Sequence, residues 1–166
     1  SHSQLRYKLL FHYHNFEEKK LIYQNSNLNV YSFPLNHSIP CCGFIFEEKL
    51  KPRKIIKEKL PHWLNLEQIS LLLNGEDILN DSCEIEFHNS DLTLEPEKQK
   101  SFAYCSDSRI DENYPKYLRE IDLVYHETTF LDDLKDRAIA TYHSTAFEVG
   151  EMAKNSAINQ LIIGHF

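Results

Sequence analysis

Residues 101–129, SFAYCSDSRIDENYPKYLREIDLVYHETT, hold two short apolar stretches that each end in polar or titratable side chains. The pattern predicts a strand at 102–105 that ends at Ser106-Asp107-Ser108, and a strand at 123–125 that ends at His126-Glu127. Residues 114–121 between them predict a short helix. This stretch therefore predicts strands and helices that alternate along the chain.

The same alternation continues to the last residue. Residues 131–139 and 145–156 predict two further helices, and 161–163 predict a strand that ends at Gly164-His165. Ser144 and Thr145 are alternative N-caps for the second of these helices, with Glu148 as the capping-box partner. Strand–helix alternation indicates an α/β fold in which helices pack on a sheet.

The first third of the chain predicts an antiparallel meander. Its strands are expected at 7–13, 21–23, 28–35 and 43–46, separated by polar turns. The third of these strands delivers Asn36-His37 at its end.

Residues 47–100, which we call the arm, differ in composition and predict an insertion between the two parts. They carry three prolines and one clear helix at 66–73, ended by Asn74-Gly75, with irregular structure expected from about residue 76. A basic run opens the arm, and it has two open interpretations, a solvated surface segment or a phosphate-binding patch. Its members are Lys49, Lys51, Arg53, Lys54, Lys57 and Lys59.

Composition limits the class of protein. Hydrophobic residues make up 42% of the chain, which is enough for a core, and the net charge of −7 has the wrong sign for a protein that coats nucleic acid with its whole surface. Four cysteines form no C-x-x-C pair, and no signal peptide or apolar run of membrane-spanning length occurs. We expect no membrane partner, and a reduced, cytoplasmic protein with buried or half-buried thiols.

Four predicted strands end in candidate ligands or acid–base groups: His37, Asp107, His126 with Glu127, and His165. Functional groups gather at the carboxyl ends of strands in α/β proteins. Each residue alone has a plainer interpretation, because a buried histidine is usually a hydrogen-bonded core residue and an aspartate after a strand is usually a turn residue. Spacing alone leaves a metal site and a structural role open.

Five short motifs occur in order: PLNHSIP at 34–40, YCSDS at 104–108, YHETTF at 125–130, HSTA at 143–146 and LIIGHF at 161–166. Together they closely resemble the ribonuclease Z family of the metallo-β-lactamase fold, over roughly residues 20–48 and 101–166. The resemblance implies an α/β, four-layer αββα sandwich. Residues 1–166 would be the C-terminal part of one such domain, with an arm-like insertion at about 47–100.

The resemblance also implies the ligands of a two-zinc site. His37 is similar to the histidine ligand after the meander, Asp107 to the aspartate that bridges two zinc ions, and His165 to the last ligand. Imidazole nitrogens and a carboxylate suit zinc, and two metal ions activate water and neutralise charge at a phosphodiester.

Further roles follow from the same resemblance. His143 is similar to the proton donor to the leaving oxygen, and Glu127 to the residue that orients it. His126 stays open between a site role and a structural role. The loops with Thr128, Ser144 and Thr145 face the tRNA in the family, and the arm position suggests phosphate contacts for basic residues of the run. These are Lys51, Arg53, Lys54 and Lys57.

The family's H-x-H-x-D-H metal motif is missing. The nearest string, HYHNFE at 12–17, has Phe16 and Glu17 where the motif needs Asp and His, so we expect structural roles for His12 and His14. The chain would then be a portion of a longer enzyme, inactive by itself, or a degenerate homologue. The retained candidate site residues favour the first alternative.

The resemblance implies an endoribonuclease that removes 3′ trailers from tRNA precursors by metal-activated attack of water on the phosphodiester. It also implies a homodimer. Two other functions remain open: a zinc phosphodiesterase or esterase for small substrates, and a non-catalytic RNA-binding remnant. A tRNA-gripping arm would favour the first function, and absence of zinc binding would favour the last.

Overall fold

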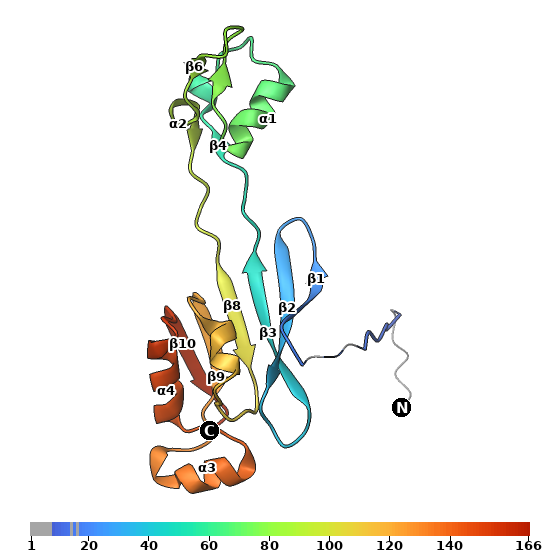
Figure 1. Ribbon diagram of the computed structural model, residues 1–166, viewed down its shortest axis with the longest axis vertical. Helices are drawn as coiled ribbons and strands as arrows, with labels where there is room; N and C mark the ends of the chain where they lie inside the picture. The colour runs from blue at the N-terminus through green and yellow to red at the C-terminus, as the bar shows by residue number, and fades with distance from the viewer. Residues whose placement is uncertain (1–7, 14, 16) are drawn as a thin grey trace, which may run out of the picture. The chain divides into compact units, whose positions relative to one another are not determined.

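A six-stranded sheet dominates the computed structural model, which describes residues 8–13, 15 and 17–166 (Figure 1). The sheet order is β1-β2-β3-β8-β9-β10. The strands are β1 Lys20–Gln24, β2 Leu28–Leu35, β3 Cys41–Glu48, β8 Ser101–Cys105, β9 Leu123–Glu127 and β10 Gln160–Gly164. The predicted meander and the three later strands thus form one sheet.

The directions of the strands determine which strand ends lie together. The links β1–β2 and β2–β3 are so short that each pair must be antiparallel, since a parallel pair needs a crossover of a dozen or more residues. β9 lies parallel to both β8 and β10, with Val124 opposite Ala103 and Leu161. The carboxyl ends of β8, β9 and β10 therefore meet at one edge of the sheet.

Helices connect the parallel strands. They are the 3₁₀ helices η2 Tyr114–Leu118 and η3 Asp132–Leu134, and the α-helices α3 Lys135–Thr141 and α4 Ala146–Asn155. Two of them, η2 and α4, pack residues against the sheet in the main core. Val149 and Met152 of α4 pack with Phe33, Ile45 and Val124 of the sheet in the main core. The expected α/β layering is confirmed.

The start of α4 resolves an alternative left open by the sequence. Thr145 is the N-cap: its hydroxyl accepts from the Glu148 N–H at 3.2 Å, and the Glu148 carboxylate accepts from the Thr145 N–H at 3.1 Å. Ser144 precedes the cap. The predicted capping box is thus present, with Thr145 rather than Ser144 as its first member.

The chain divides into two compact units, residues 1–22, 31–45 and 102–166 in one and residues 23–30 and 46–101 in the other. The second unit contains most of the arm, and it has its own core of Leu64, Leu72, Ile78 and Leu92. Its elements are β4 Lys54–Ile55, η1 Lys57–Lys59, α1 Leu66–Asn74, β5 Ile78–Leu79, β6 Ile85–Phe87, α2 Asn89–Leu92 and β7 Thr93–Leu94. α1 ends at Gly75 in the left-handed conformation, as predicted.

Irregular structure after residue 76 was expected, and this is wrong. Buried Asn89 donates to the carbonyls of Leu72 and Glu76, at 2.7 and 3.1 Å, and its own oxygens accept from the Thr93 hydroxyl. These bonds tie α2 to the end of α1 and to β7. The bonds of this one polar residue help to hold the region together, and they leave no hydrophobic period in the sequence.

Residues 8–13 form no strand, although 7–13 predicted one; residues 7 and 14 lie outside the described residues. Leu10, Phe11 and Tyr13 are all more than half exposed. An aromatic stretch becomes a strand only where a neighbouring strand pairs with it, and within the described part of the chain β1 is the edge of the sheet. His12 is exposed and lies in this stretch.

Two predicted helices differ in detail. Residues 114–121 form only η2, and the chain leaves it at Arg119 in an extended conformation. The helix expected at 131–139 begins with η3 and continues as α3 to Thr141. Their existence was predicted correctly and their boundaries were not.

All four cysteines are free thiols. Cys105 is buried and Cys41 and Cys42 are half-buried, as expected, but Cys83 is exposed. Among the described residues, every helix is too short or too polar to cross a membrane.

Two glycines give a matched test of this packing. A Cβ on Gly43 would lie 2.5 Å from the Phe33 ring and 2.9 Å from the Tyr104 carbonyl oxygen, whereas a Cβ on Gly150 in α4 would meet nothing within 4 Å. Gly43→Ala should lower the free energy of unfolding by about 1–3 kcal/mol through overpacking. Gly150→Ala should raise it by about 0.5–1 kcal/mol by removing a flexible residue from a helix.

Urea unfolding of the two variants measures both changes. Equal stability of the two variants would contradict the packing described at Gly43.

Candidate metal and acid–base site

Strand ends and two loops bring five of the predicted site residues together. Asp107 follows β8, Glu127 ends β9 and His165 follows β10. His37 lies in the loop after β2, and His143 lies between α3 and α4. The His143 ring is 5.2 Å from the His37 ring and 5.8 Å from the His165 ring, centroid to centroid.

Glu127 is fully buried, and its carboxylate accepts five hydrogen bonds. Oε1 accepts from the Ser108 and Ser144 N–H groups, both at 3.1 Å, and from His143 Nδ1 at 2.9 Å. Oε2 accepts from the N–H and the hydroxyl of Thr129, at 2.9 and 2.8 Å. A buried carboxylate is costly unless it is bonded in this way, so Glu127 holds three loops in one arrangement.

His143 is oriented by this carboxylate. A carboxylate only accepts, so His143 Nδ1 carries the proton that it shares with Glu127. Nε2 is then the nitrogen that can take up or release a proton. The ring is 15% exposed, so it is held firmly and still reaches solvent.

His37 has the same tautomer for a different reason. Its Nδ1 lies 3.1 Å from the Tyr142 carbonyl oxygen, which only accepts, so Nδ1 donates and Nε2 keeps its lone pair. Tyr142 ends α3 with a φ of 59°, a conformation that non-glycine residues rarely adopt. The unusual backbone aims this carbonyl at His37.

His165 also has a left-handed backbone, with a φ of 60°. Its Nδ1 lies 2.9 Å from the Thr129 hydroxyl and 3.6 Å from Asp107 Oδ1. Gly164 precedes it, and a Cβ there would lie 2.6 Å from the Tyr125 hydroxyl. A larger residue at Gly164 would therefore require the Tyr125 side chain to shift.

Sequence reasoning missed two residues of the site. The Thr129 hydroxyl contacts Glu127, His143 and His165. Arg109 donates to the His143 carbonyl at 3.4 Å and to Glu148 at 3.2 Å, and its N–H donates to the Asn36 carbonyl. Thr129 lies within the motif at 125–130 and Arg109 directly follows the motif at 104–108, and this position was the only signal that could have found them.

The chemical types of the candidate ligands suit zinc. His37 and His165 offer imidazole nitrogens and Asp107 offers a carboxylate, which are ordinary zinc ligands. Glu127, His143 and His165 form another group whose ligand atoms all lie within 4.8 Å of one another. Glu127 is a poor ligand because both of its oxygens already accept bonds from the protein. The set of His37, Asp107 and His165 stays a prediction, because Glu127, His143 and His165 are the group whose ligand atoms lie this close together among the described residues.

His126 faces the core. It is fully buried, its Nδ1 lies 2.6 Å from the Glu127 carbonyl oxygen, and its Nε2 lies 2.5 Å from the Tyr114 hydroxyl. Burial lowers the pKa of His126 and raises the pKa of Tyr114 well above its ordinary value. Neutral His126 therefore accepts from the Tyr114 O–H, and its role is structural.

The hydroxyls of Thr128, Ser144 and Thr145 lie inside the protein. Ser144 donates to the Ser108 carbonyl at 2.7 Å, and all three residues are buried. RNA contact by these loops stays a prediction, and any such contact would use the loop surface rather than these hydroxyls.

The four basic residues predicted to bind RNA lie in the second unit. Lys51, Lys54 and Lys57 are exposed, but Arg53 donates to Glu95 at 2.6 Å and to Thr93 at 2.7 Å. Residues 60–97 contain nine Asp and Glu and no Lys or Arg. Phosphate contact stays a prediction, and the charges restrict it to the lysines of the basic run.

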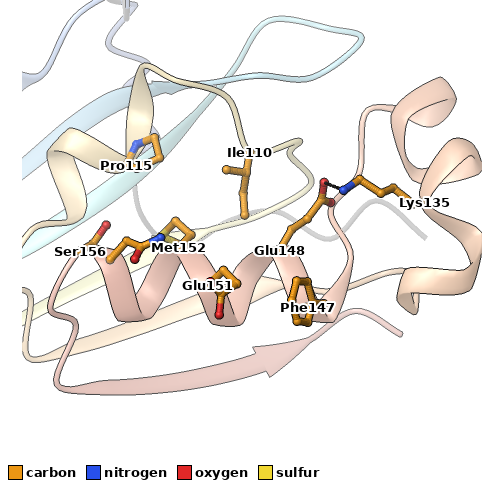
Figure 2. Close-up of a pocket in the computed structure, with 9 residues that line it drawn as sticks. Ile110, Pro115, Lys135, Phe147, Glu148, Glu151, Met152 and Ser156 are labelled. Atoms are coloured by element: carbon orange, nitrogen blue, oxygen red, sulfur yellow. Dashed lines mark ion pairs between the residues drawn. The ribbon is translucent and has the colours of Figure 1, made fainter.

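A pocket of about 340 Å³ lies beside α4, and none of the residues that line it is a histidine (Figure 2). Ile110, Met152 and Phe147 line it, and Glu148 pairs with Lys135 at 3.5 Å at one end. Burial opposes ionisation of Glu148, but the Thr145 amide and the Arg109 and Lys135 cations outweigh it and lower its pKa. This carboxylate anchors α4 and is no part of the candidate site.

Comparison with solved structures identifies the fold. Human tRNase Z, short form, matches with a TM-score of 0.56 and 20% identity, over 90% of this chain and 40% of that chain. The metallo-β-lactamase fold protein YhfI from Bacillus subtilis matches with a TM-score of 0.52 and 12% identity, over 92% of this chain and 41% of its own. The chain is therefore a mixed α/β portion of a metallo-β-lactamase fold.

Sequence comparison then finds relatives of the chain. A ribonuclease Z from Cytophaga hutchinsonii is 43% identical over 139 residues, and one from Bacteroides fragilis is 34% identical over 163 residues. These matches cover 84% and 98% of the chain, and 44% and 53% of the relatives. No family model matches. The chain is a homologue of the ribonuclease Z proteins, and it spans about half the length of the relatives it matches.

Replacement of Glu127 by Gln tests the buried carboxylate. An amide NH₂ would face N–H donors at one of the two oxygen positions, so Glu127→Gln should lower the free energy of unfolding by about 1–3 kcal/mol. Urea unfolding measures this, with Glu151→Gln on the exposed side of α4 as the control. Equal stability of the two variants would contradict the bonding described for Glu127.

His126 predicts a pH dependence of stability. Its pKa in the folded protein lies below the ordinary value of 6.5, so the unfolded chain binds the proton more readily. The free energy of unfolding should have its full value above pH 6.5 and should decrease as the pH falls below 6.5. Urea unfolding between pH 7 and about 5.5 measures the slope.

His126→Asn should flatten that slope, because Asn can still donate to the Glu127 carbonyl but does not titrate. The exposed His62→Asn should leave the slope unchanged. An undiminished slope in His126→Asn would show that another group causes it.

Proposed function

We propose that the chain belongs to a zinc-dependent endoribonuclease that removes 3′ trailers from tRNA precursors and leaves a 3′-hydroxyl on the tRNA. The observation that carries the proposal is His143, held by buried Glu127 between His37 and His165. Relatives named ribonuclease Z and a structural neighbour named tRNase Z support the substrate.

His37, Asp107 and His165 would hold the zinc. His37 presents Nε2 because its Nδ1 is bonded to a carbonyl, and Asp107 lies within 3.6 Å of His165. Zinc bound there supplies Lewis acidity for hydrolysis of a phosphodiester. Three side chains cannot complete two four-coordinate sites, so two ions would need ligands from outside this set.

His143 is the proposed general acid. Its Nε2 would donate a proton to the ribose oxygen as that oxygen leaves the phosphorus, while Nδ1 keeps its bond to Glu127. Glu127 compensates the positive charge that His143 carries before the transfer. The two residues thus form a unit that holds and releases one proton.

RNA would contact the exposed lysines of the basic run, Lys51, Lys54 and Lys57, through its phosphates, which gives affinity without sequence reading. We further propose a cytoplasmic homodimer. The absence of a membrane-spanning helix among the described residues is compatible with that location.

His143→Ala and His165→Ala, made in the natural protein that contains these residues, separate the proposed roles. His143→Ala should slow cleavage of a precursor tRNA by about 10²–10⁴-fold and leave the zinc content unchanged. His165→Ala should lower the zinc content, which metal analysis of the purified protein measures. His62→Ala, an exposed histidine of the arm, is the control for both assays.

Loss of zinc in His143→Ala would instead favour the ligand group of Glu127, His143 and His165. Unchanged zinc content in His165→Ala together with unchanged cleavage in His143→Ala would refute the enzymatic proposal.

A further inference from the structure

Thr129 follows β9 by two residues and lies at the centre of the candidate site. Its hydroxyl oxygen is 2.8 Å from Glu127 Oε2, 2.9 Å from His165 Nδ1 and 3.2 Å from His143 Nδ1. We propose that Thr129 is a positioning residue that fixes the ring and the tautomer of His165, so that Nε2 of His165 is presented to the metal.

Hydrogen-bond direction carries the proposal. The hydroxyl has one proton, and the Glu127 carboxylate can only accept, so the Thr129 O–H donates to Glu127. The lone pairs of the same oxygen then face His165 Nδ1, which must donate. His165 Nδ1 is thereby protonated, and its Nε2 keeps the lone pair that a metal requires.

The backbone reinforces this arrangement. The Thr129 N–H also donates to Glu127 Oε2, so the hydroxyl and the amide of Thr129 both donate to the same oxygen. Thr129 is half-buried, and its position is set by a carboxylate that is itself fully buried. The hydroxyl therefore has little freedom to turn away from His165.

A rival partner for His165 lies farther away. Asp107 Oδ1 is 3.6 Å from Nδ1, beyond hydrogen-bond distance, and Asp107 is one of the proposed zinc ligands. An aspartate that binds metal is not free to hold the ring. Thr129 is the closer partner of His165 Nδ1, and its hydroxyl is bonded to Glu127.

As a consequence, Glu127 supports both the proposed proton donor and a proposed metal ligand. Glu127 holds His143 directly and holds His165 through the Thr129 hydroxyl. The proposed proton donor and the proposed ligand therefore depend on one buried carboxylate. Partners of this kind fix the orientation of metal-binding histidines, and their loss costs about 10–100-fold in metal affinity.

The test uses the natural protein that contains these residues, labelled with ¹⁵N, and four variants of it. Thr129→Val and Thr129→Ala remove the hydroxyl, and Thr129→Ser restores it. Thr141→Val, which removes a hydroxyl bonded only to the Arg137 carbonyl in α3, is the matched control. Imidazole ¹⁵N shifts of His165 report its tautomer. The parent, Thr129→Ser and Thr141→Val should show a proton on Nδ1, and the hydroxyl-free variants should show a mixture of tautomers.

Zinc affinity, measured by competition with a chromogenic chelator, is the second readout. Thr129→Val and Thr129→Ala should weaken it by about 10-fold or more, and Thr129→Ser should keep it. Unchanged His165 shifts in both hydroxyl-free variants would overturn the inference, as would unchanged zinc affinity. Either variant suffices if the other fails to fold.

The role of Thr129 in presenting a metal ligand rests on the proposed function, but different results would refute the two proposals. Absence of zinc binding by the natural protein would refute the proposed function, whereas the His165 shifts judge the Thr129 contact without any metal.

Discussion

The buried carboxylate of Glu127 is the interaction on which the site depends. It lies at the end of β9, in the middle of three parallel strands, and accepts from residues of the loops after β8 and β9 and from the loop before α4. Removal of a carboxylate from water costs roughly several kcal/mol, and hydrogen bonds within the protein must compensate this cost. Five donors supply these bonds, so the loops must stay where they are for the carboxylate to stay buried.

Two residues of the site have an unusual backbone conformation. Tyr142 and His165 both have a positive φ, and each contacts or contains a candidate ligand. Such conformations persist only where the surrounding structure enforces them. Here the carbonyl of Tyr142 lies 3.1 Å from His37 Nδ1, and His165 is itself one of the site rings, so both of these residues position groups of the site.

The sequence predicted the sheet and the site better than the arm, and the reason is physical. β8, β9 and β10 are short apolar runs with polar ends, and their parallel pairing alone brings Asp107, Glu127 and His165 to one edge. Hydrogen bonds between distant residues leave no period in the sequence. Asn89 helps to hold residues 76–94, and Thr129 and Arg109 help to hold the site, but the sequence pattern gave none of the three a role.

The three histidine rings share one tautomer but have three different partners, and the difference supports their proposed roles. His37 donates to a neutral carbonyl and His165 to a neutral hydroxyl, whereas His143 donates to a carboxylate. A metal ligand must be a neutral imidazole, and a neutral acceptor gives no support to a second proton. A proton donor must pass through the doubly protonated state, and a carboxylate compensates its charge. The partner of Nδ1 therefore separates the proposed acid from the proposed ligands, although the His143 ring lies within 5.8 Å of both other rings.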